Sequence, residues 1–539
     1  MKKILLAVFL ISIKVQASTY YIATSENGGN DSNTGTPSSP WLTLSHACQK
    51  VSLPGDTIYV NSGRFIETAQ CVLAPGVSIV GEGYSSHIIS HFDNGSESFR
   101  NVLIYMSSDT EGSKGNQTIS FILLDGDFYE GRRAIYCRYR NNVSIHHCAI
   151  INFRKSGINF YSETSWTEPP LVYSTNCSMS YNYISDCTEN PDNGGECNLR
   201  IAGYEDVDIS YNTIVNTKRI AGRSLYTSQL KNCRINNNTF YCRKEVSDYW
   251  NFAMEIYNTR GGQEVYRNTI FGGGTIDLAG HRIEKGTYEF SASVHDNYLL
   301  LANPVNYSDH IVVAITIEAW ERIESVCIYN NYIKNFPWGI SCTMGKYDRW
   351  GGNGTIDDLH IYNNVIENPS HADKSMSSFG IAILKQTNAR YRNNINILNN
   401  TIIGNTPYAW RGIVYEATGR NEKINIKNNI VQGFTKYGII IHYFDGSIGD
   451  LSIDNNLINN SGNRNEVFFS GPKSLRIFTN NNHLKTDPRF VSETDFHLSP
   501  GSPAIAAGAF VGLLKDHEGV DWSNPPSMGA FEYHDARTQ

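Results

Sequence analysis

A short alternating pattern of apolar and polar residues recurs along most of this chain, and each copy ends at an asparagine. Copies such as VDISYNTI, CIYNNYI and NIKNNIV have the two-residue period of a β-strand with one buried face. The asparagines that close the copies are Asn182, Asn212, Asn238, Asn268, Asn297, Asn331, Asn364, Asn400, Asn429, Asn456 and Asn482. They follow one another at intervals of 26 to 36 residues. Each interval holds two or three short strands, which is one coil of a parallel β-helix.

The repeated asparagine predicts a tight turn at one corner of each coil. Asparagine tolerates left-handed backbone geometry, and its amide can bond to the asparagine of the next coil. Asparagine-rich loops of a β-sandwich are the alternative, which the near-regular spacing disfavours. We therefore predict an all-β fold, a single-stranded right-handed parallel β-helix of about 11–13 coils.

The two ends of the chain lack the asparagine motif and predict caps, which an open stack of strands needs to avoid edge pairing. Residues 42–51, LTLSHACQKV, have apolar positions at helical spacing and predict a helix across the first coil. The resulting organisation is a signal peptide at 1–17, an N-terminal cap with the first strands at 18–118, the regular β-helix at 119–483, and a loop-rich C-terminal capping segment at 484–539.

The first residues have the pattern of a secretory signal. Lys2 and Lys3 precede an apolar run from Ile4 to Ile13, and Ala17 offers a small residue for cleavage. No cysteine follows the cleavage point to carry a lipid, and no later apolar run has membrane-spanning length, so we expect a secreted or periplasmic protein without a membrane partner. The chain has eleven cysteines, an odd number, and most lie in strand-like segments, which favours buried thiols over a disulfide framework.

The overall charge limits the class of partner. Charged residues make up 18% of the chain and the net charge is -7, so nucleic acid is not the expected partner and an anionic ligand would need local cations. We expect a monomer.

Several end motifs resemble those of a known group of proteins. The pieces GNDSNTGTPSSPW, LPGDTIYV and VSIVGEG, with DPRF, DFHLSPGSPAI and MGAFEY near the C-terminus, resemble secreted bacterial β-helix proteins of the pectate-lyase-like superfamily. The resemblance implies a polysaccharide or oligosaccharide partner, since members include lyases, hydrolases, esterases, epimerases and binding proteins that act on glycans. It also covers family 9 lyases, whose Asp-rich calcium cluster and catalytic Lys do not align with this sequence.

Candidate chemistry lies on the strand that commonly opens with Gly-apolar in each coil. Its alternate side chains should form two outward columns. We place Ser224, Glu255 and Asp277 in the first column and Tyr226, Tyr257 and Glu318 in the second. Glu255 and Asp277 should then lie roughly 5 Å apart, so that one holds a proton at neutral pH. Asp277 and Glu318 should lie roughly 8 Å apart along the backbone.

Paired carboxylates at these separations favour a glycoside hydrolase that needs no cofactor. Asp277 and Glu318 suit an inverting mechanism, whereas Glu255 and Asp277 suit a retaining one. The side chains that we expect to bind substrate are Arg200, Arg223, Tyr226, Tyr257, His281, Arg282 and Trp320.

Two alternatives stay open. A polysaccharide lyase would use acidic residues to bind calcium and a base to remove a proton beside a uronate carboxylate. A noncatalytic glycan-binding β-helix would favour scattered aromatic residues without paired acids.

Overall fold

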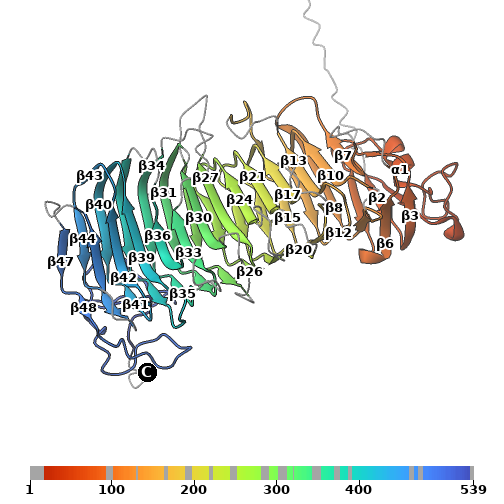
Figure 1. Cartoon of the computed structure of the whole chain (residues 1–539). Coiled ribbons are helices and arrows are strands. Elements are labelled where there is room, and N and C mark those ends of the chain that lie inside the picture. The colour runs from red at the N-terminus through yellow and green to blue at the C-terminus, as the bar shows by residue number, and fades with distance from the viewer. Residues whose placement is uncertain are drawn as a thin grey trace, which may run out of the picture.

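The chain forms one long stack of strands that runs from the N-terminal to the C-terminal end of the molecule (Figure 1). The computed structural model describes residues 17–92, 101–128, 131–162, 168–188, 197–217, 223–242, 252–280, 290–301, 312–319, 321–342, 354–369, 377–385, 391–460, 466–471 and 477–534. The strands pair in parallel between successive coils, which confirms the predicted right-handed parallel β-helix. Its sheets of 14 to 17 strands hold more coils than the predicted 11–13, because the coils before Asn182 lack the asparagine motif on which the count was based.

Three parallel sheets form the walls of the solenoid, and each coil adds one strand to each wall. Within the described residues, the first sheet has 17 strands, the second 15 and the third 14. The strands of the first sheet are β1 (Thr19–Ile22), β2 (Thr57–Val60), β5 (Ser78–Gly81), β8 (Ser113–Ser120), β11 (Arg140–His146), β15 (Ser178–Ser180), β19 (Asp208–Ser210), β22 (Arg234–Asn236), β25 (Gln263–Tyr266), β28 (Ala292–His295), β31 (Arg322–Tyr329), β34 (Thr355–Tyr362), β37 (Tyr391–Leu398), β40 (Arg420–Lys427), β43 (Ser447–Ile448), β44 (Leu451–Asp454) and β47 (Ile477–Asn480).

The second sheet follows the first in each coil. Its strands are β3 (Gly63–Glu67), β6 (Ser86–Ser90), β9 (Leu123–Asp125), β12 (Ala149–Ile151), β16 (Tyr183–Ser185), β20 (Thr213–Asn216), β23 (Thr239–Cys242), β26 (Thr269–Gly272), β29 (Tyr298–Leu300), β32 (Tyr332–Lys334), β35 (Val365–Glu367), β38 (Thr401–Ile403), β41 (Ile430–Gln432), β45 (Leu457–Asn459) and β48 (His483–Leu484).

The third sheet carries the columns in which we predicted chemistry. Its strands are β4 (Cys71–Val72), β7 (Ile104–Ser107), β10 (Arg133–Arg138), β13 (Ser156–Tyr161), β17 (Cys197–Ala202), β21 (Arg223–Ser228), β24 (Phe252–Tyr257), β27 (Thr275–Gly280), β30 (Val313–Ala319), β33 (Trp338–Cys342), β36 (Phe379–Ile383), β39 (Arg411–Ala417), β42 (Tyr437–Tyr443) and β46 (Val467–Ser470). A separate two-stranded pair joins β14 (Ser174–Thr175) to β18 (Tyr204–Glu205).

The core is a continuous column of aliphatic side chains inside the three walls. In one coil, Ile209 of the first sheet, Ile214 of the second and Leu225 of the third are fully buried and belong to the same cluster. The equivalent residues of the neighbouring coils stack on them, since Ile209 pairs with Ile235 and Leu225 with Met254. Inward residues therefore fix the register of every coil.

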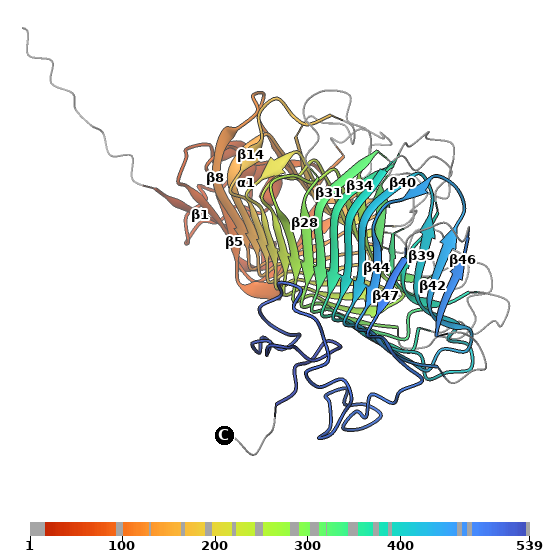
Figure 2. The same ribbon diagram turned by 90° about the vertical axis from the view of Figure 1, so that its left-hand side faces the viewer.

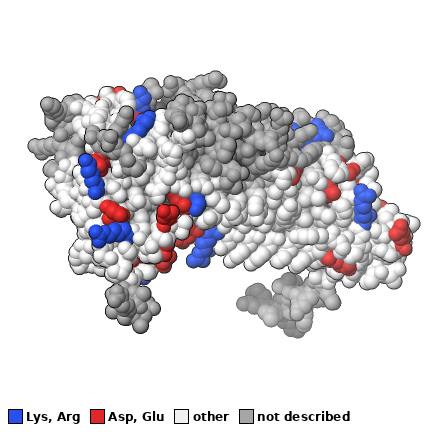
Figure 3. Space-filling model, turned by 60° about the horizontal axis from the view of Figure 1, so that its bottom comes forward, with Lys and Arg blue, Asp and Glu red and all other residues white. Residues whose placement is uncertain are grey.

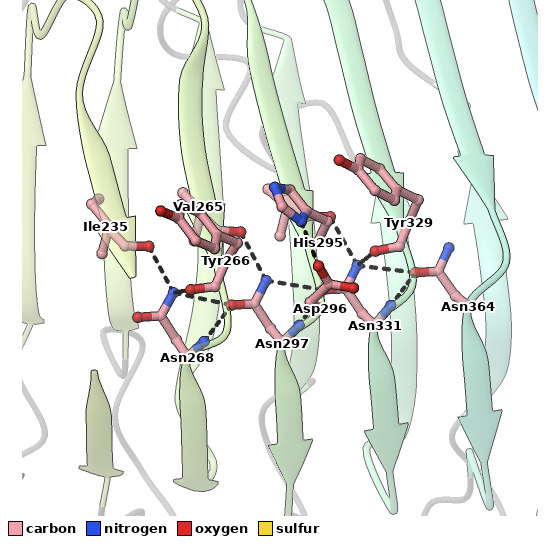
Figure 4. A network of polar contacts seen from close by, with 11 residues as sticks. Ile235, Val265, Tyr266, Asn268, His295, Asp296, Asn297, Tyr329, Asn331 and Asn364 are labelled. Carbon is pink, nitrogen blue, oxygen red and sulfur yellow. Dashed lines mark hydrogen bonds and ion pairs between the residues drawn. The ribbon is translucent and has the colours of Figure 1, made fainter. Parts of the chain in front are cut away.

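The asparagine ladder lies at the corner between the first and second sheets (Figure 4). The side-chain Nδ2 of Asn297 donates to Oδ1 of Asn331 at 2.9 Å and to the backbone oxygen of Val265 at 2.9 Å. The left-handed residue of this turn is the one before the ladder asparagine: Asp296 has φ 54° and Asn330 has φ 54°. The prediction of a ladder is confirmed, but the left-handed conformation falls one residue before the ladder asparagine.

The N-terminal cap contains α1 (Leu44–Lys50), close to the helix predicted at 42–51. Thr43 caps its first turn by accepting a hydrogen bond from the backbone of His46, and the buried carboxylate of Glu67 accepts from the backbone of Leu44 at 2.6 Å. Both contacts satisfy amides that the first helical turn leaves without partners. The apolar face of α1 joins the core through Leu44, Ala47 and Cys48.

The C-terminal segment, residues 486–534, is loop-rich as predicted, and it lies along the side of the last coils (Figures 1 and 2). Its Ala509 exchanges two hydrogen bonds with the side chain of Asn428, the left-handed residue of one ladder turn. Phe496 and Phe531 pack on Val365 and Ile403 of the second sheet. The segment thus covers apolar positions on the outside of that sheet.

All eleven cysteines are free thiols, and ten of them are buried, which confirms the interpretation as core residues. The predicted signal peptide at 1–17 lies almost wholly outside the described residues. Among the described residues, the structure contains no helix of the length and apolar character required to cross a membrane. Charged side chains on the face shown in Figure 3 lie in small groups of both signs on a largely uncharged surface.

Candidate functional site

Three carboxylates lie together on the outside of the third sheet. We call the outer face of its strands from β17 to β30 the site wall. Glu255 of β24 pairs with Asp277 of β27, and Ala279 pairs with Glu318 of β30. The alternate residues Ile256, Leu278 and Ile317 are in the core, so the acids face outward. The register therefore brings the three predicted acids to one wall, with Glu255 and Asp277 in one column and Glu318 in the next.

Tyr226 occupies a different column from the one predicted. It pairs with Glu255 and therefore lies in the column of Glu255 and Asp277, whereas Ser224 bonds to Asn216 at an interior corner. The cause is a two-residue slip in the aligned sequence of β21, because Leu225 pairs with Leu199 and Met254. A slip of two residues keeps the outward face and changes only the column.

Glu255 is held by two neighbouring side chains. It forms an ion pair with Arg223, whose Nη2 also approaches its Oε1 at 3.4 Å, and it accepts a hydrogen bond of 2.6 Å from the hydroxyl of Tyr257. Both Glu255 and Arg223 are buried. The negative charge of Glu255 is therefore neutralised by a neighbouring cation. This environment suits a residue that positions Arg223 and Tyr257, and it does not suit a nucleophile.

Asp277 has the opposite environment. It is 1% exposed, and its Oδ1 has no hydrogen-bond partner within the described part of the chain. Burial and the charge of Glu318 raise the pKa of Asp277 well above its ordinary value, and the charge of Arg223 only partly opposes this. Asp277 therefore keeps its proton at a pH at which an exposed aspartate is ionised.

Glu318 and Tyr257 complete the cluster. Glu318 is partly exposed, and the register places its Cα atom roughly 8 Å from that of Asp277, one coil and two residues away. Burial and the charges of Asp277 and Glu318 raise the pKa of Tyr257 well above its ordinary value, so its hydroxyl stays protonated and donates to Glu255. The pair of Asp277 and Glu318 thus combines a buried carboxyl group with a partly exposed one.

Aromatic and cationic side chains extend the site wall on its N-terminal side. The guanidinium carbon of Arg200 lies 5.3 Å from the ring centre of Tyr161 and 5.2 Å from that of Tyr226. The ring of Tyr226 lies 5.4 Å from that of Tyr257. Sequence reasoning did not single out Tyr136, which continues the column of Arg200 through Asn159, although the alternation of RAIYCR in β10 gives its outward position.

Three of the predicted binding residues, His281, Arg282 and Trp320, lie outside the described residues. The structure places the other four, Arg200, Arg223, Tyr226 and Tyr257, on the site wall. Among the described residues, no group of three or more His, Cys, Asp or Glu side chains is arranged to hold a metal ion.

Comparison with known proteins gives similarities of fold at low sequence identity. No protein-family model matches this sequence, and no curated protein matches it. The DFA-IIIase of Arthrobacter chlorophenolicus A6 in complex with GF2 is 12% identical with a TM-score of 0.35, over 62% of this chain and 90% of that chain. The alginate lyase of Paenibacillus sp. str. FPU-7 is 11% identical with a TM-score of 0.39, over 64% of this chain and 99% of that chain. At such identity, neither similarity assigns a role to a residue of the site wall.

Proposed function

We propose that this protein is a polysaccharide-degrading enzyme, and specifically a glycoside hydrolase that uses Asp277 and Glu318. The observation that carries the proposal is the difference between the two neighbouring carboxyl groups: Asp277 is buried with a raised pKa, whereas Glu318 is partly exposed. A buried carboxyl group that keeps its proton beside a carboxyl group that meets solvent is the arrangement that acid and base catalysis needs.

In this proposal, Asp277 donates its proton to the glycosidic oxygen as the bond breaks. Glu318 accepts a proton from a water molecule, which attacks the sugar from the opposite side. The partly exposed Glu318 suits this role because it meets solvent, and its side chain starts from a Cα atom roughly 8 Å from that of Asp277 on the same wall. No cofactor takes part in these steps.

Glu255 has a positioning role in this proposal, since Arg223 and Tyr257 already engage its carboxylate. A retaining mechanism would need Glu255 as a free nucleophile beside Asp277, and the ion pair disfavours that choice. Tyr226 and Tyr257 offer aromatic surface to a sugar on the same wall.

The test is turnover on a panel of acidic and neutral polysaccharides, followed by reducing ends and by the ultraviolet absorbance of unsaturated products, with and without a calcium chelator. We expect new reducing ends without the ultraviolet signal. Asp277→Asn and Glu318→Gln should each lower kcat about 10²–10⁴-fold, the range for loss of a general acid or base. Glu264→Gln, which changes an exposed carboxylate on the first sheet, is the matched control and should leave kcat unchanged.

Three outcomes would overturn the proposal. Growth of the ultraviolet signal, lost on chelation, would identify a calcium-assisted lyase. Binding of a glycan without turnover of any polymer in the panel would identify a noncatalytic binding protein. Unchanged kcat in Asp277→Asn would remove this residue from the reaction. The anomer released first, followed by NMR, separates inversion from retention.

A further inference from the structure

Arg200 is a cation fixed in place on the site wall. It projects outward from β17, where it pairs with Asn159 on one side and Tyr226 on the other. Its guanidinium lies against the rings of Tyr161 and Tyr226 at 5.3 and 5.2 Å. These two aromatic contacts hold the guanidinium in one position. The side chain of Arg200 therefore loses little conformational freedom when it binds an anion.

The contrast with Arg223 shows what Arg200 lacks. Arg223 forms an ion pair with Glu255, and its Nη2 donates to Oε1 at 3.4 Å, whereas Arg200 forms no ion pair within the described part of the chain. The buried Nε of Arg200 also has no hydrogen-bond partner among the described residues. A guanidinium carries five N–H donors in a planar fork that matches carboxylate and sulfate oxygens. A guanidinium that is held in position and has N–H donors without acceptors in the chain is typical of a binding site for an external anion.

The position of Arg200 separates this site from the reacting groups. Arg200 lies two coils before Glu255 and three before Asp277 in the same column. At about 4.8 Å per coil, the Cα atoms of Arg200 and Asp277 lie roughly 14 Å apart. An anion at Arg200 would therefore belong to a sugar some way along the chain from the bond next to Asp277.

We propose that Arg200, flanked by Tyr161 and Tyr226, binds an anionic substituent of an acidic polysaccharide at a subsite distant from the cleaved bond. The substituent is a uronic acid carboxylate or a sulfate ester, which share the oxygen geometry that the guanidinium recognises. This inference rests on the proposed function only in taking the site wall as the glycan-binding surface. It commits the substrate to an acidic class, which the carboxylate pair alone does not.

The test measures binding without turnover, in the Asp277→Asn variant. Calorimetric Kd values are measured for polygalacturonate and alginate as carboxylated probes, chondroitin sulfate as a sulfated probe, and dextran and arabinan as neutral probes. We expect an acidic polymer to bind, and Arg200→Gln to weaken its binding about tenfold, the size expected for loss of charge-assisted hydrogen bonds. Arg200→Lys should recover part of the loss, because it keeps the charge and loses the fork. The probe with the larger change identifies carboxylate or sulfate as the anion.

Arg234→Gln is the matched control, because Arg234 is an exposed cation on the first sheet that pairs with Asp208. It should leave every Kd unchanged. The inference would be overturned if no acidic probe binds, or if Arg200→Gln weakens the binding of acidic and neutral probes equally. It would also be overturned if Arg200→Gln keeps the native thermal transition and the Kd for the acidic probes is unchanged. Failure of the proposed hydrolase is read separately, from absence of turnover by the wild-type protein.

Discussion

Removal of one asparagine from the middle of the ladder should destabilise the neighbouring coils far more than removal of the last one. Asn331 is fully buried: its Oδ1 accepts two hydrogen bonds, and its Nδ2 lies within hydrogen-bond distance of three acceptors, which share its two hydrogens. Asn482 at the end of the ladder is partly exposed and takes part in three. The same substitution to alanine therefore removes a different number of bonds at two equivalent turns.

The magnitude follows from the partners that lose their only bond. At about 1 kcal/mol net for each bond, two accepted bonds and two donated hydrogens give an upper value of about 4 kcal/mol. Two partners keep another bond, since Asn297 Nδ2 still donates to Val265 and Asn364 Oδ1 still accepts from the backbone of residue 331. We therefore expect Asn331→Ala to cost about 3–4 kcal/mol and Asn482→Ala about 1–2 kcal/mol.

Native-state hydrogen exchange is the suitable assay, because a long solenoid need not unfold in one step. Amides of β28 and β31 should show the loss of opening free energy in Asn331→Ala, while those of β2 and β5 stay as in the wild type. Asn331→Asp extends the test, since a buried aspartate at this position has a raised folded pKa. Its destabilisation should be present at pH 7 and diminish as the pH falls toward the pKa of the unfolded residue. Equal losses in Asn331→Ala and Asn482→Ala would refute the reasoning.

Four further predictions concern other groups in the chain. Glu255→Gln should lower the opening free energy of β21 and β24 by about 3–5 kcal/mol in native-state hydrogen exchange, because it removes the charge of Glu255 from the buried Arg223, whereas Asp277→Asn should cost little at low pH. Since the folded pKa of Asp277 is raised, the wild type should lose stability relative to Asp277→Asn as pH rises above about 4, the ordinary aspartate pKa. Asn428→Gly keeps the left-handed turn but removes both side-chain bonds to Ala509, so limited proteolysis should cleave the C-terminal segment sooner; an unchanged cleavage rate would contradict this docking. A thiol reagent should modify at most one cysteine in the native protein, and Cys327→Ser should abolish that reaction; rapid modification of several would contradict their burial.

The fold could be predicted because the asparagine of each turn is a local signal with a long-range consequence. Each ladder residue marks its own coil, so the intervals along the sequence gave the stacking before any register was known. The register within the third sheet was harder. The segments around Tyr226 and Glu255 both fit an alternating pattern, and only the pairing of Leu225 with Met254 decides between two alignments that differ by two residues. The ion pair of Arg223 depends on that register and could not be predicted from spacing.

The same register explains why neighbouring carboxylates on one wall acquire different properties. Glu255 and Asp277 are one coil apart in a single column, so their backbone surroundings are nearly the same. The difference comes from what lies beside them: Arg223 and Tyr257 engage Glu255, while the charge with the largest effect on the pKa of Asp277 is that of Glu318. A solenoid can give adjacent acids different partners in this way by changing one residue per coil, because each coil places its side chains against its neighbours without altering the core. Conversion of Arg223 to a neutral residue should therefore remove the ion pair of Glu255. It should also remove a charge that lowers the pKa of Asp277, which is a smaller effect.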